Sequence, residues 1–296
     1  MTELFPLSIL SYPQIDPVFL QIGPLELRWY GLAYVAGILL GWLYGRRLAS
    51  NPHLWPNGVS PLTAIDIDDF ILWITGGIVV GGRLGSVLFY DLPRYLADPL
   101  EIFRVWDGGM SFHGGLIGVT LAIIAFAWKR RLPLFSLIDV VAASVPFGLF
   151  FGRIANFVNG ELWGAPSDAP WAMVFPTGGP VPRHPSQLYE ALLEGVVLFL
   201  ILRLLTHRFK MLSRPRFVGS AFVGLYAVAR IAVEFFRMPD AQVGYLYGTD
   251  WFTRGMELSI PMLLIAVWGI ATAKPRAYAP RPLADGEPSR SKQAEP

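Results

Sequence analysis

The sequence predicts an all-α protein, a bundle of about seven helices that cross a membrane. Of its 296 residues, 53% are hydrophobic and only 16% are charged, whereas soluble domains usually carry about 25% charged residues. The apolar residues occur in continuous runs of roughly 16–20 residues, close to the length that a helix needs to cross a bilayer. Because these runs show no alternation with period two, they favour helices over the strands of a barrel.

Seven stretches have this length and composition. They are Trp29–Gly45, Phe70–Phe89, Met110–Trp128, Leu134–Phe151, Leu188–Leu205, Phe217–Phe236 and Leu258–Ala273. The last is the shortest, and Pro261 falls in its first turn, where proline is tolerated. Six or eight spans are also compatible with the sequence, because the apolar segment Phe5–Leu10 is short. That segment lacks the basic flank and small-residue cleavage site of a signal peptide, so we do not expect cleavage.

The basic residues predict the orientation. Fifteen of the 24 Lys and Arg residues follow the first, third, fifth and seventh stretches. Cytoplasmic loops carry an excess of Lys and Arg, so we expect an outer N-terminus and a cytoplasmic C-terminus. Residues 1–274 then form a single transmembrane domain with an external, proline-rich loop at 160–187. The polar residues 275–296 are expected to form a disordered cytoplasmic tail.

Composition also excludes several functions. A net charge of +2 is too balanced for a nucleic-acid partner. The absence of Cys excludes disulfides, thiolate metal ligands and a cysteine nucleophile. The four histidines, His53, His113, His184 and His207, lack metal-ligand spacing, so a metal is not expected. No G-x-S-x-G motif or phosphate loop occurs.

Polar residues lie in the outer halves of the apolar stretches, or follow the stretches on the outer side, in the orientation that the basic residues predict. They include Tyr30, Arg83, His113, Arg153, Asn156, Asn159, Glu161, Glu190, Glu194, Tyr226, Arg230, Glu234 and Arg237. Ionisable groups are costly in lipid and usually face an interior cavity. The sequence therefore predicts one polar cavity that opens to the outer leaflet.

Structural roles for some of these residues remain open at this point. Arg230 and Glu234 have the spacing of an i, i+4 ion pair, and His113 could be a packing residue. Asp139, in the inner half of the fourth stretch, could be a structural hydrogen-bond acceptor. The glycines at four-residue spacing, Gly77, Gly81, Gly85, Gly114 and Gly118, are better explained by close helix packing than by ligand binding.

Two other classes of membrane protein compete with an enzyme. A transporter or channel would distribute charged residues through both leaflets, whereas here they gather in the outer half. A seven-helix receptor shares the topology but gives no reason for the spaced Arg, Asn, Asn and Glu of residues 153–161.

Several motifs resemble one known family. These are WYGLAY at 29–34, GGRLGSVLFY at 81–90, VWDGGMSFHGG at 105–115, GRIANFVNGELWG at 152–164, PRHPSQLYE at 182–190 and VEFFRMPDAQ at 233–242. Together they resemble the prolipoprotein diacylglyceryl transferase family, from about Tyr12 to Trp268. The resemblance implies a multi-pass enzyme of the bacterial cytoplasmic (inner) membrane, with its active site facing the outer leaflet.

The resemblance also implies the reaction. A diacylglyceryl group passes from phosphatidylglycerol to the lipobox cysteine thiol of a prolipoprotein, which forms a thioether and releases glycerol phosphate. This is the first step of bacterial lipoprotein maturation, and it needs no cofactor. The partners are then phosphatidylglycerol, prolipoprotein signal peptides with a lipobox cysteine, and the surrounding membrane lipid.

Residue roles follow from the same resemblance. Arg153 and Arg230 are expected to bind the phosphate and stabilise the departing group, with Arg237 and Arg83 behind them. His113 is either the general base or a group that orients the lipid while the arginines lower the thiol pKa. For the remaining residues we expect headgroup and loop contacts from Asn156, Asn159, Glu161 and Gly164, hydroxyl contacts from Tyr30 and Tyr226, and positioning of the arginines by Glu190, Glu194 and Glu234.

Overall fold

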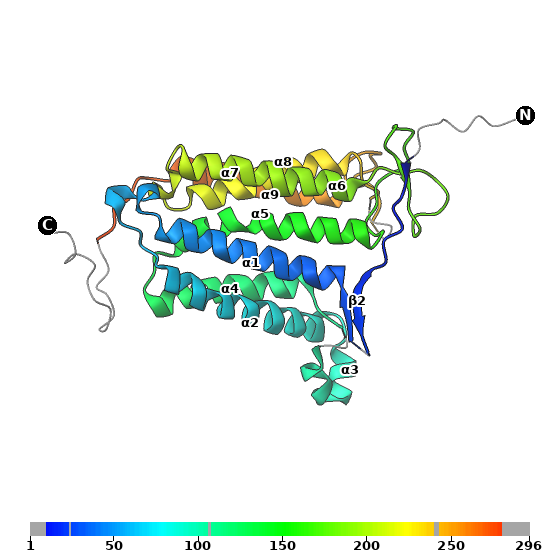
Figure 1. Cartoon of the computed structure of the whole chain (residues 1–296), viewed down its shortest axis with the longest axis horizontal. Coiled ribbons are helices and arrows are strands. Elements are labelled where there is room, and N and C mark those ends of the chain that lie inside the picture. Colours follow the sequence, from blue (N-terminus) through cyan, green and yellow to red (C-terminus); the bar gives the residue numbers. More distant parts are fainter. Residues whose placement is uncertain (1–9, 24, 106–107, 240–242, 280–296) are drawn as a thin grey trace, which may run out of the picture.

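The computed structural model describes residues 10–23, 25–105, 108–239 and 243–279. Its long helices lie side by side in an elongated bundle with loops at both ends (Figure 1). The helices are α1 (Trp29–Ser50), α2 (Ala64–Phe89), α3 (Leu92–Ala97), α4 (Phe112–Arg130), α5 (Leu134–Val158), α6 (Ser186–Glu190), α7 (Leu198–His207), α8 (Phe217–Glu234) and α9 (Arg254–Thr272). A π-helical segment, Ala191–Val197, joins α6 to α7 without a break.

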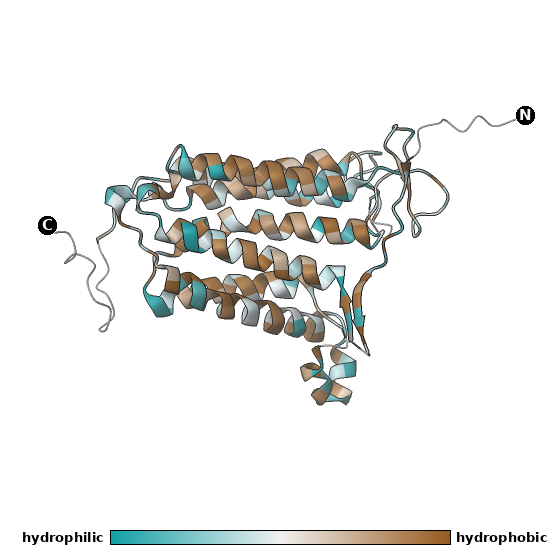
Figure 2. Cartoon of the chain, viewed as in Figure 1, coloured by the Kyte–Doolittle hydropathy of each residue, from teal (hydrophilic) through white to brown (hydrophobic). Residues whose placement is uncertain are grey.

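The lateral surface of the bundle is apolar. Within the described residues, five helices are long and apolar enough to cross a membrane, namely α2, α4, α5, α8 and α9. Large apolar side chains on them are exposed, among them Leu72 and Leu264. Figure 2 shows that hydrophobic residues predominate along the long helices. The structure therefore confirms the class of helical membrane proteins. Both α1 and the continuous helix Ser186–His207 also reach the length of a hydrocarbon layer of about 30 Å.

Several helices continue beyond the apolar stretches of the sequence. Helix α5 ends at Val158 rather than Phe151, because Tyr12 satisfies its last turn. The Tyr12 hydroxyl lies 2.6 Å from the carbonyl oxygen of Phe157 and 2.9 Å from that of Val158. Hydropathy does not reveal such polar turns, since their polar groups are satisfied by other segments of the folded chain.

Four short strands add to the helices, which the all-α prediction did not include. Strands β2 (Val18–Ile22) and β3 (Leu25–Arg28) pair antiparallel. Strands β1 (Leu10–Ser11) and β4 (Met173–Val174) pair in parallel. Strands of this length leave no spanning-length signal in a hydropathy profile. The β2–β3 hairpin lies beside α3 at one end of the bundle (Figure 1).

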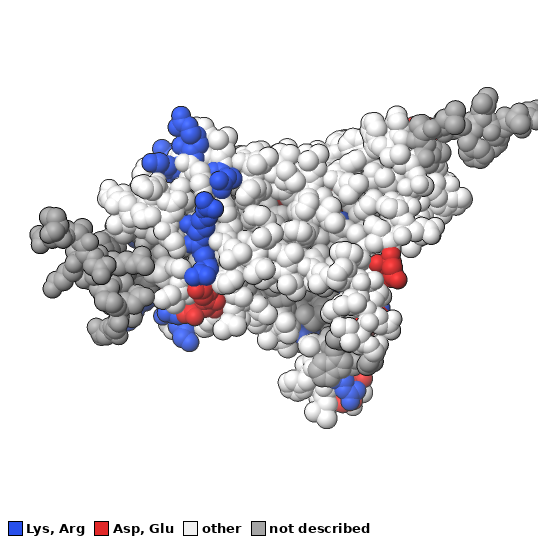
Figure 3. Space-filling view, in the orientation of Figure 1, with Lys and Arg blue, Asp and Glu red and all other residues white. Residues whose placement is uncertain are grey.

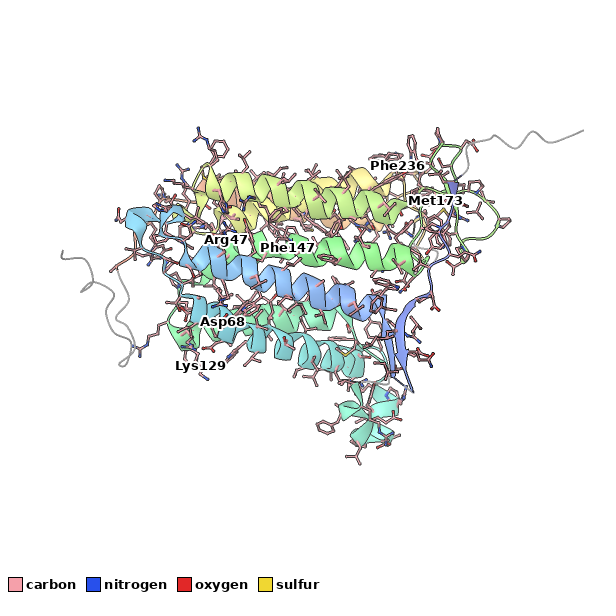
Figure 4. All side chains as sticks on the ribbon, in the orientation of Figure 1. Arg47, Asp68, Lys129, Phe147, Met173 and Phe236 are labelled. Atoms are coloured by element: carbon pink, nitrogen blue, oxygen red, sulfur yellow. The ribbon has the colours of Figure 1, made fainter. Side chains whose placement is uncertain are left out.

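The apolar core occupies mainly the opposite half of the bundle. Fully buried residues there include Leu48 of α1, Leu137 of α5 and Leu202 of α7. Figure 4 shows Arg47, Asp68 and Lys129 at this end, with Phe147 near the middle. The polar side chains described below gather in the other half, which carries Met173 and Phe236.

Asp139 joins two helices inside this core. Its carboxylate is fully buried and accepts hydrogen bonds from the backbone N–H groups of Arg216 at 2.8 Å and Gly219 at 2.7 Å. Helix α8 has no capping side chain of its own, so a residue of α5 satisfies the free amides of its first turn. Asp139 is thus a structural acceptor.

The chain after α9 packs against the same end of the bundle. Tyr278 shares a 2.6 Å hydrogen bond with Ser136, and the backbone N–H of Arg276 donates to the carbonyl of Ser213. Most of the tail predicted to be disordered, residues 280–296, lies outside the described residues, as does most of the apolar segment Phe5–Leu10.

Glycines allow α2 and α4 to pack closely, as the sequence predicts. A Cβ atom on Gly81 would lie 2.4 Å from the carbonyl oxygen of Gly114, and one on Gly118 would lie 2.1 Å from that of Gly77. These distances exclude any side chain at the interface. The backbones therefore approach as they do in small-residue contacts between membrane helices.

Replacing Gly118 should separate these helices. We expect Gly118→Ala to lower the free energy of unfolding by about 1–3 kcal/mol, because the new methyl group overlaps the backbone of α2. Gly115→Ala is the matched control on the same helix, since its Cβ would meet nothing closer than 3.9 Å. Thermal unfolding in detergent measures both variants, and equal midpoints for the two would contradict this account of the interface.

Candidate active site

The polar side chains meet at the end of the bundle that Met173 and Phe236 mark in Figure 4. This end lies opposite the band of Lys and Arg residues visible in Figure 3. We call the central group the Arg–Glu cluster. It consists of Arg153 on α5, Glu190 at the end of α6, Glu194 in the π-helical segment, Arg230 and Glu234 on α8, and Arg237 just after α8.

Glu190 lies at the centre of the cluster. Its carboxylate oxygens are 3.2 Å from Nη1 of Arg153, 3.1 Å from Nη1 of Arg230 and 2.6 Å from Nη1 of Arg237. One fully buried carboxylate therefore connects three guanidinium groups that come from two different parts of the chain.

The other two glutamates complete the pairing. Nε and Nη2 of Arg153 both donate to Oε2 of Glu194 at 3.2 Å. Oε1 of Glu234 lies 2.5 Å from Nη2 of Arg230 and 3.6 Å from Nε of Arg237. Three positive and three negative groups thus give the cluster a formal charge of zero.

The glutamates of the cluster are more deeply buried than its arginines. The side chains of Glu190 and Glu194 are 0% exposed and that of Glu234 is 4% exposed, whereas those of Arg153, Arg230 and Arg237 are 14–20% exposed. The accessible surface of the cluster therefore belongs mainly to the arginine side chains. Because a guanidinium carries five N–H donors, this surface can still donate to an anion after the glutamates are paired.

The π-helical segment Ala191–Val197 brings Glu194 into the cluster. Its Gly195 packs against Phe150 of α5 so closely that a Cβ would lie 2.7 Å from the Phe150 Cβ. Single π-helical turns occur often at functional sites. The apolar pattern alone does not predict this π-helical turn, since a π-helix and an α-helix bury the same kinds of residues.

Asn156 and Glu161 form a second polar group beside the cluster. Nδ2 of Asn156 donates to Oε1 of Glu161 at 2.8 Å and lies 3.5 Å from the hydroxyl oxygen of Tyr30. Gln187, which the sequence did not single out, donates to the carbonyl of Glu161 at 2.6 Å. Asn159 ends α5 at the turn into the loop at 160–187, where Gly160 has a φ of +64°.

Gly164 lets the loop at 160–187 pack against the segment that carries Arg237. Its N–H donates to the carbonyl of His184, and the next N–H, of Ala165, donates to the carbonyl of Phe236, both at 2.9 Å. A Cβ on Gly164 would lie 2.4 Å from that Phe236 oxygen. The role of Gly164 is therefore to allow this close backbone packing.

His184 and Tyr189 anchor the same loop. The Trp171 indole N–H donates to the Tyr189 hydroxyl at 2.6 Å, and this hydroxyl lies 3.0 Å from Nδ1 of His184. Burial lowers the pKa of His184 below its ordinary value. This favours a neutral ring, which can accept a hydrogen bond from the Tyr189 hydroxyl.

Arg83 lies outside the cluster. It is buried, and its Nη1 donates to the Tyr95 hydroxyl at 2.8 Å and to the carbonyl of Gly108 at 2.8 Å. Nη2 donates to the carbonyl of Arg104. The structure thus gives Arg83 a structural role, in which it holds the connection between α2 and α4; its binding of substrate stays a prediction.

His113 and Tyr226 have simpler surroundings. His113 is exposed in the first turn of α4, where its ring contacts Phe112. Within the described residues, no hydrogen bond or ion pair connects His113 to the Arg–Glu cluster. Tyr226 lies one turn before Arg230 on α8 and stacks on Phe222.

No three His, Cys, Asp or Glu side chains of the described residues converge so as to hold a metal ion. The carboxylates of the cluster are instead engaged by arginines. That the protein works without a metal or another cofactor remains a prediction from the sequence.

Fold and site together define a helical membrane protein with a guanidinium surface suited to an anionic group. A family model described as prolipoprotein diacylglyceryl transferase matches residues 17–272. The chain belongs to this family, which confirms the resemblance seen in the sequence, and it is therefore a transferase.

Curated relatives cover most of the chain. It is 61% identical over 272 residues to the phosphatidylglycerol–prolipoprotein diacylglyceryl transferase of Mesorhizobium japonicum, covering 92% of this chain and 95% of that protein. The enzyme of the same name from Rhizobium meliloti is 61% identical over 273 residues (92% and 97%). That from Agrobacterium fabrum is 58% identical over 268 residues (90% and 95%).

Glu190 should be the most sensitive position of the cluster. We expect Glu190→Gln to lower the free energy of unfolding by about 3 kcal/mol, because three arginines then share two glutamates and one positive charge of the cluster is left uncompensated. Glu26→Gln is the control, since the Glu26–Arg28 pair is exposed and should contribute little. Chemical and thermal unfolding in detergent compare the two variants. Equal losses would contradict the central role of Glu190.

Proposed function

We propose that this protein transfers the diacylglyceryl group of phosphatidylglycerol to the thiol of a lipobox cysteine in a prolipoprotein. The thiolate sulfur forms a bond to the glycerol carbon, the bond from that carbon to the phosphate oxygen breaks, and glycerol phosphate leaves. The observation that carries this proposal is the guanidinium surface of the Arg–Glu cluster. The names of its close relatives support the same reaction.

The three arginines bind the lipid phosphate. A planar guanidinium can donate two parallel hydrogen bonds to phosphate oxygens. Negative charge increases on the departing phosphate during the reaction, so fixed donors at this place stabilise the transition state more than the bound lipid. Arg153 and Arg230 carry this role, with Arg237 beside them. The buried glutamates fix the orientation of the guanidinium planes.

The neighbouring polar residues bind the glycerol headgroup and shape the site. Asn156 and Tyr30 present an amide and a hydroxyl next to the cluster, and Tyr226 adds a second hydroxyl from α8. Asn159, Glu161 and Gly164 hold the start of the external loop over this region.

The protein crosses the membrane seven times. Helix α1 and the continuous helix Ser186–His207 join the five apolar helices as spans. The two ends of the described chain lie at opposite ends of the bundle, as an odd number of spans requires (Figure 1). The band of Lys and Arg at the C-terminal end (Figure 3) marks the cytoplasmic side. The Arg–Glu cluster then faces the outer leaflet of the bacterial inner membrane.

The acceptor cysteine comes from the prolipoprotein, because this chain contains none. A thiol has an ordinary pKa of about 8.5, so the reaction needs either a base or a positive field that favours the thiolate. His113 is the candidate base. The alternative is that the arginines favour the thiolate and His113 orients the lipid.

The transfer can be measured directly. We expect purified protein to convert a lipobox peptide to its diacylglyceryl thioether in the presence of phosphatidylglycerol, with mass spectrometry as the readout. Arg153→Ala should lower the turnover by at least about a hundredfold, as loss of a transition-state donor does. Arg28→Ala, which removes an exposed arginine, should retain the parent rate. No thioether from folded parent protein would overturn the function, and normal turnover by Arg153→Ala would overturn its role.

The role of His113 is separable by pH. If it is the base, His113→Gln should reduce turnover most near pH 7, and the defect should shrink above about pH 8.5, where the substrate thiol ionises unaided. A loss of equal size at every pH would instead assign His113 to lipid orientation. Rates of thioether formation between pH 6.5 and 9.5 decide between the two roles.

A further inference from the structure

The first turn of α9 meets the Arg–Glu cluster from a helix that contributes no charge to it. Thr253, the N-cap of this helix, is buried. Its hydroxyl donates to Oε2 of Glu234 at 2.6 Å and accepts from the N–H of Met256 at 3.3 Å. A hydroxyl has one donor and two acceptor sites, so both bonds can exist together. The cap of α9 thus also binds the carboxylate that pairs with Arg230.

Gly255 packs against the same ion pair. A Cβ on Gly255 would lie 2.6 Å from Oε1 of Glu234 and 3.2 Å from Nη2 of Arg230. The first distance is closer than real Cβ contacts, so a side chain here would displace the Glu234 carboxylate. Thr253 therefore holds Glu234 through a hydrogen bond, while Gly255 leaves room for the Glu234–Arg230 pair.

We propose that Thr253 and Gly255 are positioning residues for the transfer reaction. With Oε2 of Glu234 held by Thr253, the other oxygen faces Nη2 of Arg230 at 2.5 Å and Nε of Arg237 at 3.6 Å. Loss of the hydroxyl leaves Oε2 as a buried acceptor without its partner, and the carboxylate turns toward the arginines to compensate. The guanidinium planes then leave the orientation that fits the lipid phosphate. This inference rests on the phosphate-binding role proposed above for the two arginines.

The test compares two threonines that cap spanning helices. Thr63 caps α2, and its hydroxyl lies near the carboxylate of Asp66 rather than near the cluster. We expect Thr253→Val and Thr63→Val to lower the unfolding midpoint similarly, since both lose a cap. Only Thr253→Val should lower kcat/KM for phosphatidylglycerol, by about tenfold, as one lost hydrogen bond to a charged group predicts. Thr253→Ser, which keeps the hydroxyl, should restore kcat/KM to within about twofold of the parent.

Gly255→Ala provides an independent variant if Thr253→Val does not fold. It leaves the cap intact and displaces the Glu234–Arg230 pair, so it should also lower kcat/KM for phosphatidylglycerol. Parent-like kcat/KM in Thr253→Val or in Gly255→Ala, measured on folded protein, would overturn the proposal.

Arg230→Ala in the same assay distinguishes the positioning role of Thr253 and Gly255 from the phosphate-binding role of the arginines. An inactive Arg230→Ala variant together with a fully active Thr253→Val variant would remove only the positioning role of α9. A fully active Arg230→Ala variant would instead overturn the phosphate-binding role on which that positioning depends.

Discussion

The half of this structure that holds the Arg–Glu cluster depends on a buried carboxylate that contacts three guanidinium groups. Glu190 is fully buried and lies within 3.2 Å of Arg153, Arg230 and Arg237. Buried charges are costly unless they are paired with good geometry, so the helices that carry these residues must meet at this depth. These ion pairs therefore determine how α5, α8 and the continuous helix of α6 and α7 pack against one another.

The division of the bundle into two halves follows from this constraint. The end with the basic band has a close-packed apolar core, and Asp139 fixes α5 to the start of α8. With that end held by its apolar core and by Asp139, the opposite end of the bundle can expose its arginines in part while it buries the carboxylates. Such a layered arrangement suits the binding of a lipid phosphate, because the donors are oriented before the ligand arrives.

The sequence predicted the membrane class, the apolar helices and all six residues of the cluster. Arg230 and Glu234 stand out because charges are rare in apolar stretches, and Arg153 and Arg237 lie within two residues of the end of such a stretch. Thr253 and Gln187 could not be found in this way, since a threonine before a helix is ordinary capping chemistry. Arg83 stood out for the same reason as the cluster arginines, yet its partners are backbone carbonyls and a tyrosine of the neighbouring loop.

By itself, the sequence determined that the chain is helical and lies in a membrane, because hydropathy over a spanning length depends only on neighbouring residues. Its motifs also determined the family. Only the tertiary structure decided which charges meet, since Arg153 and Glu194 are 41 positions apart and helical periodicity says nothing about partners at that separation. It also decided that the carboxylates lie beneath the arginines, because burial is a property of packed helices and not of a residue type.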